Sequence, residues 1–273
     1  MGKLNKAGIA GLCLCFLAIL FGIATNGGIG TIKNFIHIPS LIVTLGGSLF
    51  AVLATADSFS DFTDGLTGIF YAYQKCHATA NEASLQIYEM SDISRKDGLL
   101  QLEEFTHNIN NTFLQKGITL VVDGSDPELV KDVLENELVH KEERVRRRIK
   151  FWQDLGAYAP AWGMVGTLLG LINMMKSMGS DPNAIGTGMS LALITTLYGS
   201  IIANWLCIPI ARKLEKKLEQ ESLVMEIIIE GVLSIQAGEN VRIIKEKINA
   251  IIESNSEDAE SNTPQQADGA SSL

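Results

Sequence analysis

Four long apolar runs divide the chain into membrane-type and polar segments. The first two runs cover residues 7–24 and 38–56, and the other two lie within residues 156–209 on either side of a short polar turn. A helix of about twenty apolar residues, at about 1.5 Å per residue, spans the ~30 Å hydrocarbon core of a bilayer. The pattern therefore predicts an all-α integral membrane protein with four transmembrane helices.

The polar segment of residues 57–152 predicts a compact helical insertion between the second and third spans. Apolar residues recur at spacings of three and four from residue 66 to residue 73, which is typical of an amphipathic helix. A second helical stretch is expected from residue 81 to about residue 115, and turn signals follow it. Asp126 then resembles an N-cap and Pro127 a first helical residue, so the next helix should run from there into the third span.

The segment after the fourth apolar run predicts one long amphipathic helix, which continues past Gly238 to about residue 252. Residues 254–273 are too polar to bury a core, so we expect a disordered tail. The expected domains are the first two spans, the helical insertion, the hairpin of the third and fourth spans, the C-terminal helix and the tail: residues 1–56, 57–152, 153–211, 212–253 and 254–273.

The basic residues give the expected orientation. They cluster before the first run, before the third run at residues 144–150, and after the fourth run at residues 212–217. With four spans, all three clusters lie on one side, so the positive-inside rule places both termini and the insertion in the cytoplasm. The net charge is -9 and no basic domain stands alone, which argues against a nucleic-acid partner.

Polar residues interrupt the apolar hairpin of residues 156–209. Pro160 and Thr167 are seven positions apart and share one helix face, and Thr195 and Thr196 lie in the next run. Pro160 leaves a backbone carbonyl free, which in lipid must be satisfied locally or face a water-filled path. Hydroxyls and free carbonyls together suit a cation, although such threonines also commonly donate to carbonyls of their own helices.

No carboxylate lies inside an apolar run, and the hairpin carries only Lys176 and Asp181 as charged residues. Ion-translocating proteins normally place an ionisable group at depth in the membrane. If the hairpin serves an ion path, the acid must therefore come from another chain.

The sequence offers no catalytic constellation, and we expect no enzyme and no cofactor. Its four histidines are scattered, and its four cysteines show no zinc-type spacing. Gly163, Gly166 and Gly170 sit inside an apolar run with no following Lys-Ser/Thr, so they indicate close helix packing rather than a phosphate loop.

Several motifs resemble the A-subunit of bacterial flagellar motor stators, the MotA/PomA family, within the wider group that includes TolQ and ExbB. These motifs are APAWGMVGTLLGLINMM, DPNAIGTGMSLALITTLYGSIIANWLCIPIARKL and the charged stretch SRKDGLLQLEE. The resemblance covers most of residues 1–250. TolQ and ExbB proteins usually have three spans, so the early pair of spans favours a stator, and a TolQ/ExbB-like subunit that energises an envelope process is the alternative.

The resemblance implies a torque-generating complex in the bacterial inner membrane. A pentameric ring of A-subunits would surround two copies of a stator B-subunit of the MotB/PomB type, and each copy would supply one membrane helix with an essential aspartate. The family's functional prolines match Pro160 and Pro209. Its charges that face the rotor switch protein, of the FliG type, match two pairs of residues: Arg95 and Lys96, and Glu103 and Glu104.

The transported ion follows less directly from the residues. Thr167, Thr195 and Thr196 resemble the pattern of sodium-type members, whereas proton-type members often carry another residue at the Thr196 position. Sodium is therefore favoured over the proton.

Overall fold

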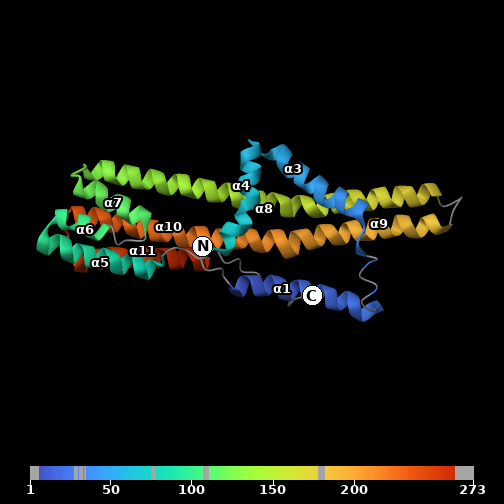
Figure 1. Cartoon of the computed structure of the whole chain (residues 1–273), viewed down its shortest axis with the longest axis horizontal. Coiled ribbons are helices and arrows are strands. Elements are labelled where there is room, and N and C mark those ends of the chain that lie inside the picture. The colour runs from blue at the N-terminus through green and yellow to red at the C-terminus, as the bar shows by residue number, and fades with distance from the viewer. Residues whose placement is uncertain are drawn as a thin grey trace, which may run out of the picture. The chain divides into compact units, whose positions relative to one another are not determined.

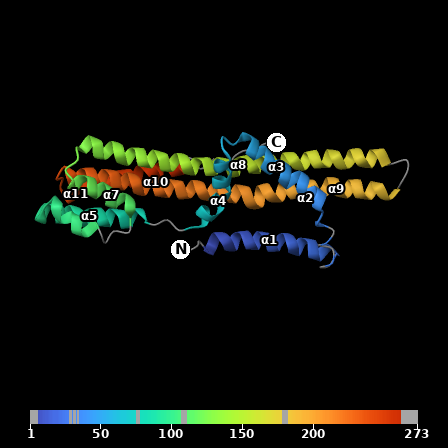
Figure 2. The same cartoon turned by 45° about the horizontal axis from the view of Figure 1, so that its top comes forward.

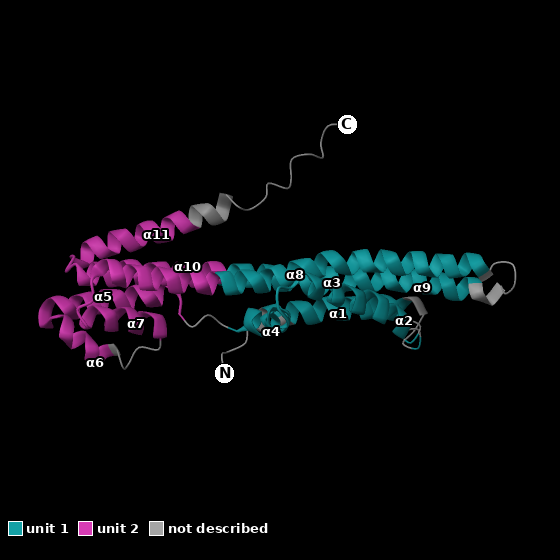
Figure 3. Cartoon of the chain, turned by 90° about the horizontal axis from the view of Figure 1, so that it is seen from above, with its two compact units in different colours: residues 1–75, 143–217 teal, residues 76–142, 218–273 magenta. Residues whose placement is uncertain are grey.

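The computed structural model describes residues 6–27, 30, 33, 35–74, 78–106, 111–177 and 182–261. The regular elements of these residues are helical, which confirms the all-α class (Figure 1). The chain forms two compact units (Figure 3). Unit 1 contains residues 1–75 and 143–217, and unit 2 contains residues 76–142 and 218–273.

Unit 1 contains the apolar helices. Helix α1 spans Lys6–Gly27. The next helix runs through α2 (Ile38–Leu41), the π-helical segment η2 (Ile42–Gly46) and α3 (Gly47–Thr55). After α4 (Phe59–Tyr73), unit 1 continues with the C-terminal part of α8 (Pro127–Ser177) and with α9 (Pro182–Ile201), the π-helical η4 (Ile202–Cys207) and the start of α10 (Ile208–Gln236).

Among the described residues, three helical stretches are long and apolar enough to cross a membrane: Ile38–Thr55, Pro127–Lys176 and Ile185–Gln236. A shorter apolar helix covers Ala10–Thr25, where the first span is expected. Figures 1 and 2 both show α9 running alongside the C-terminal part of α8, as the predicted hairpin requires.

Unit 2 has a closed apolar core. Its elements are α5 (Ala80–Asp97), the short 3-10 helix η3 (Leu99–Gln101), α6 (Leu102–Thr106), α7 (Thr112–Val122), the start of α8, the end of α10, and α11 (Val241–Ser261). Ile87, Leu114, Leu134, Ile228 and Ile248 come from five of these elements and are fully buried together. Burying each such side chain contributes about 1.5–3 kcal/mol, so the opposing apolar helix faces hold this unit together.

The predicted start of α8 is confirmed. The Asp126 side chain accepts a hydrogen bond from the backbone N–H of Glu128 at 2.9 Å, as an N-cap does. Pro127 is the first helical residue, and the helix continues without interruption to Ser177.

Two stretches predicted as continuous helices are instead broken at glycines. Helix α5 ends at Asp97 because Gly98 has φ 91°, and a separate helix, α7, covers residues 112–122, where turn signals had suggested a break. Helix α10 ends before Gly238, whose φ of 68° suits a residue without a Cβ. Helix α11 then extends to Ser261, so the expected tail begins as helix, and residues 262–273 lie outside the described residues.

Candidate functional site

Helices α8 and α9 approach each other at backbone distance through glycines. A Cβ added to Gly199 would lie 2.6 Å from the Ala159 carbonyl oxygen and 3.0 Å from the Pro160 Cα. A Cβ added to Gly170 would lie 2.6 Å from the carbonyl oxygen of Gly188. Small residues at such positions let membrane helices pack closely, as the sequence predicts, and this contact determines how the polar residues of the hairpin face one another.

The structure separates the three candidate threonines. The hydroxyl oxygens of Thr167 and Thr196 lie 3.5 Å apart, and Thr196 is exposed. Thr195 is fully buried, and a Cβ added to Gly166 would lie 2.6 Å from the Thr195 Cβ. The hairpin therefore joins Thr167 to Thr196 and places Thr195 in the contact between the helices.

All three threonines also donate hydrogen bonds to carbonyls of their own helices. Thr167 donates to Gly163 at 3.0 Å, Thr195 donates to Ala192 at 2.9 Å, and Thr196 donates to Ala192 at 3.2 Å. Because a hydroxyl that donates keeps two acceptor lone pairs, Thr167 and Thr196 can still present oxygen ligands to a cation. Back-bonding and an ion-path role are thus compatible for this pair.

The two candidate prolines lie in different backbone settings. Helix α8 continues through Pro160, which has no N–H to donate to the carbonyl four residues earlier. Pro209 follows the π-helical η4, in which the Ile208 N–H donates to the carbonyl of Ala203, five residues earlier. A proline without an N–H is compatible with such a shift of hydrogen-bond register, and Pro209 was the only sequence signal for it.

Contacts from the preceding helices reach the hairpin beside the threonines, and the sequence did not indicate them. Thr44 of η2 is fully buried and donates to the Thr195 carbonyl at 3.4 Å. Trp205 of η4 donates from Nε1 to the Leu12 carbonyl of α1 at 2.8 Å, and its ring stacks on Phe16 with centroids 5.1 Å apart. The hydroxyl of Tyr198 donates to the Phe35 carbonyl.

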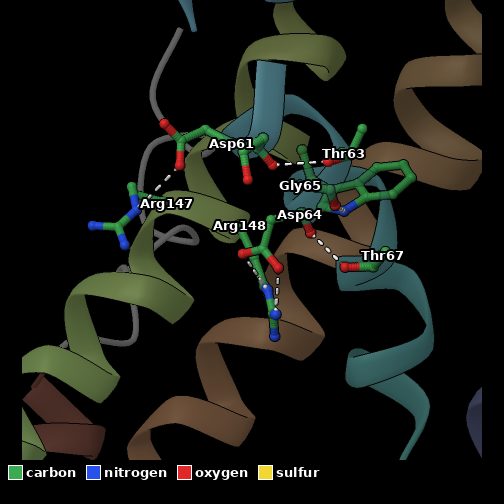
Figure 4. A network of polar contacts seen from close by, with 9 residues as sticks. Asp61, Thr63, Asp64, Gly65, Thr67, Arg147 and Arg148 are labelled. Atoms are coloured by element: carbon green, nitrogen blue, oxygen red, sulfur yellow. Dashed lines mark hydrogen bonds and ion pairs between the residues drawn. The ribbon is translucent and has the colours of Figure 1, made fainter. Parts of the chain in front are cut away.

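Helix α4 is attached to α8 by a charged pair (Figure 4). Arg148 donates to both carboxylate oxygens of Asp64, at 3.0 and 2.6 Å, and the hydrogen bond from Arg148 lowers the pKa of the Asp64 carboxyl. Next to this pair, Nε1 of buried Trp152 donates to the Gly65 carbonyl at 3.1 Å. Nε of the neighbouring Arg147 lies 3.9 Å from Oδ1 of Asp61, and the Arg147 side chain is far more exposed than that of Arg148.

The side chain of Lys217 contacts the C-terminal end of α4. Lys217 of α10 is 6% exposed and donates to the carbonyls of Tyr71 and Gln74, at 2.7 and 3.1 Å. Its Nζ also lies 3.8 Å from the centroid of the Tyr71 ring, and the Arg148 guanidinium lies 5.1 Å from the same centroid. Lys217 therefore caps the C-terminus of α4, where the Tyr71 carbonyl also accepts a hydrogen bond from the Gln74 N–H at 3.3 Å.

The candidate charged residues lie on two separate helices rather than on one. Arg95 and Lys96 occupy the last turn of α5, and Glu103 and Glu104 the first turn of α6. All are exposed. Each pair suits the helix end that carries it, because the helix dipole favours cations at a C-terminus and anions at an N-terminus.

Comparisons with known proteins agree with this architecture. Residues 105–227 match the model of the MotA/TolQ/ExbB proton channel family. Motility protein A of Treponema phagedenis is 40% identical over 235 residues, which are 84% of this chain and 88% of that protein. Chemotaxis protein PomA of Vibrio alginolyticus is 39% identical over 243 residues, covering 88% of this chain and 92% of that protein.

Solved structures give the same result. The structure of C. jejuni MotAB superposes with a TM-score of 0.81 at 26% identity, and covers 90% of this chain and 95% of that chain. The flagellar MotAB stator complex from Bacillus subtilis superposes with a TM-score of 0.80 at 25% identity, with coverage of 95% and 100%. This chain therefore belongs to the MotA/PomA family of flagellar motor stator A-subunits, within the MotA/TolQ/ExbB group.

Proposed function

We propose that this chain is the A-subunit of a flagellar motor stator, which converts an ion-motive force into torque on the rotor. The observation that carries the proposal is its similarity, over most of both chains, to Motility protein A and PomA. The hairpin supports it from chemistry, because it presents the hydroxyl pair of Thr167 and Thr196 in an apolar setting without an acid of its own.

The proposed complex lies in the bacterial inner membrane. The chain crosses the membrane four times with both termini in the cytoplasm, and a pentamer of copies surrounds a B-subunit of the MotB/PomB type. The B-subunit supplies the aspartate that the apolar runs of this chain lack. The neighbouring solved structures support such a partner, since they are described as MotAB complexes.

In this proposal the ion passes the faces of α8 and α9 that carry Thr167 and Thr196. Sodium is favoured over the proton because the paired hydroxyl oxygens of Thr167 and Thr196 can replace part of a sodium ion's hydration shell. Thr195 supports the hairpin from inside the helix contact. Pro160 and Pro209 belong to the segments that change conformation when the ion binds.

Torque reaches the rotor through the charged residues of unit 2. The pairs Arg95/Lys96 and Glu103/Glu104 face a rotor switch protein of the FliG type. Opposite charges on the two surfaces would steer the encounter and orient the contact.

The function is tested in a motile bacterium without its own stator genes. We expect this chain, expressed with its cognate B-subunit, to restore rotation that stops when sodium is withdrawn and persists when a protonophore collapses the proton gradient. Rotation that persists without sodium and stops with the protonophore would contradict sodium coupling. No rotation despite full-length protein in the membrane would contradict the stator function and favour the TolQ/ExbB-like alternative.

Thr196→Ala is expected to raise the sodium concentration for half-maximal motor speed about fivefold, because one net polar contact is worth about 1 kcal/mol. Thr196→Ser keeps the hydroxyl and should retain the wild-type concentration. Thr195→Ala removes a buried hydroxyl that donates to the Leu191 and Ala192 carbonyls of its own helix, and it should leave the sodium dependence unchanged. Bead-rotation speed against sodium concentration measures all three variants, and equal shifts for Thr195→Ala and Thr196→Ala would contradict the assignment.

A further inference from the structure

Leu100 is the most exposed large apolar side chain among the described residues, at 74%. It lies in η3, the short turn between α5 and α6. Single exposed apolar residues are common on protein surfaces, so exposure alone would not indicate a site. The surroundings of Leu100 distinguish it from such residues.

The fold forces Leu100 outward. Gly98, with φ 91°, ends α5, and the Gln101 N–H donates to the Gly98 carbonyl at 3.3 Å. On either side of Leu100, Leu102 is fully buried in the core of unit 2 and Leu99 packs against that core. Burying Leu100 would withdraw these neighbours from the core, so its side chain stays in solvent while the turn is intact.

Opposite charges flank Leu100 along the chain. The basic pair Arg95 and Lys96 precedes it at the end of α5, and the acidic pair Glu103 and Glu104 follows it at the start of α6. An apolar centre with a charged rim is the usual organisation of a protein–protein interface. An anionic membrane surface or a nucleic acid fits poorly, because the acidic pair would repel it.

We propose that Leu100 is the apolar anchor of the surface through which this chain binds its rotor partner. The proposal rests on the stator function proposed above. The partner it fits is a protein surface with an apolar pocket, bordered by acidic groups opposite Arg95 and Lys96 and by basic groups opposite Glu103 and Glu104. The charges orient the encounter, and burial of Leu100 sets how long the contact lasts.

The test compares two equally accessible leucines in the full complex. Leu100→Ser is compared with Leu85→Ser, because Leu85 is also exposed, at 66%, on α5 of the same unit. Neither change removes a buried side chain, so both proteins should fold. Leu100→Met retains an apolar side chain of similar volume. The readouts are the dwell time of fluorescently labelled stator units at the motor and the speed of a bead at high load.

We expect Leu100→Ser to shorten the dwell time about tenfold and to lower the high-load speed, since a buried leucine side chain contributes that much to binding. The sodium concentration for half-maximal speed should not change. Leu85→Ser and Leu100→Met should behave as wild type. Equal dwell times for the two serine variants, or a Leu100→Met variant as impaired as Leu100→Ser, would overturn the role of Leu100. A wild-type complex that drives no rotation would overturn the stator function itself.

Discussion

Gly199→Leu is expected to separate α9 from α8 and to lower the stability of the complex by about 3 kcal/mol, the upper range for overpacked sites. The atoms that a new side chain would meet first, the Ala159 carbonyl oxygen and the Pro160 Cα, belong to the backbone. Backbone atoms cannot rotate away as a flexible side chain can, so the two helices must move apart. The same displacement would separate the hydroxyls of Thr167 and Thr196, and rotation should be lost.

The thermal unfolding midpoint of the complex purified in detergent measures this effect. Gly186→Leu is the matched control, because Gly186 lies on the same helix and a Cβ there would have no neighbour within 4 Å. The control should melt close to wild type. If Gly199→Leu and Gly186→Leu melt at the same temperature, the close contact at Pro160 does not stabilise the hairpin.

Arg148→Ala is expected to destabilise the attachment of α4 by about 2 kcal/mol, because it removes two charge-assisted hydrogen bonds and a contact with the Tyr71 ring. The Arg148 side chain is 17% exposed, whereas the side chain of Arg147 is 56% exposed. Arg147→Ala should therefore cost at most about 0.5 kcal/mol. Thermal unfolding and limited proteolysis of the segment containing α4 distinguish the variants. Equal losses of stability in Arg148→Ala and Arg147→Ala would contradict the role of the Arg148–Asp64 pair in attaching α4.

The same pair predicts a pH dependence. Arg148 lowers the pKa of Asp64 in the folded protein below its ordinary value of 3.8. The stabilisation is therefore complete at pH values above the unfolded-state pKa and is lost as the pH falls through the lower folded-state pKa. The difference in melting temperature between wild type and Asp64→Asn should be constant near neutral pH and shrink only in acid. A difference that already shrinks between pH 7 and pH 5 would contradict this linkage.

The local pattern of the sequence predicted the helical class and the start of α8, because hydrophobic periodicity and an Asp-Pro cap act over a few residues. It did not predict the breaks after α5 and α10. Gly98 and Gly238 lie in stretches whose apolar spacing continues on both sides, so periodicity alone cannot distinguish a helical glycine from one with positive φ. The expected domain boundaries stay a prediction, although the compact units combine distant segments of the chain.

The candidate site was predictable in composition but not in arrangement. Thr195 and Thr196 are neighbours in sequence and point about 100° apart on a helix, and the glycine contacts with α8 decide which of them is buried. The pair of Arg148 and Asp64 joins residues 84 positions apart, and only the tertiary fold brings them together. The shift of register at η4 likewise depends on packing that a single proline does not specify.

The hydrogen bonds that join a side chain of one helix to a backbone carbonyl of another constrain the sequence at the donor more than at the acceptor. Trp205 donates to the main-chain carbonyl of Leu12, and Lys217 donates to those of Tyr71 and Gln74. Every residue type carries a carbonyl, so the accepting positions can exchange side chains without losing these bonds. The donors cannot, because only a few side chains reach so far with an N–H. The main-chain part of this docking therefore depends on single donor residues, whereas the side chains of Asp64, Tyr71 and Phe16 add contacts that a substitution in α4 or α1 would remove.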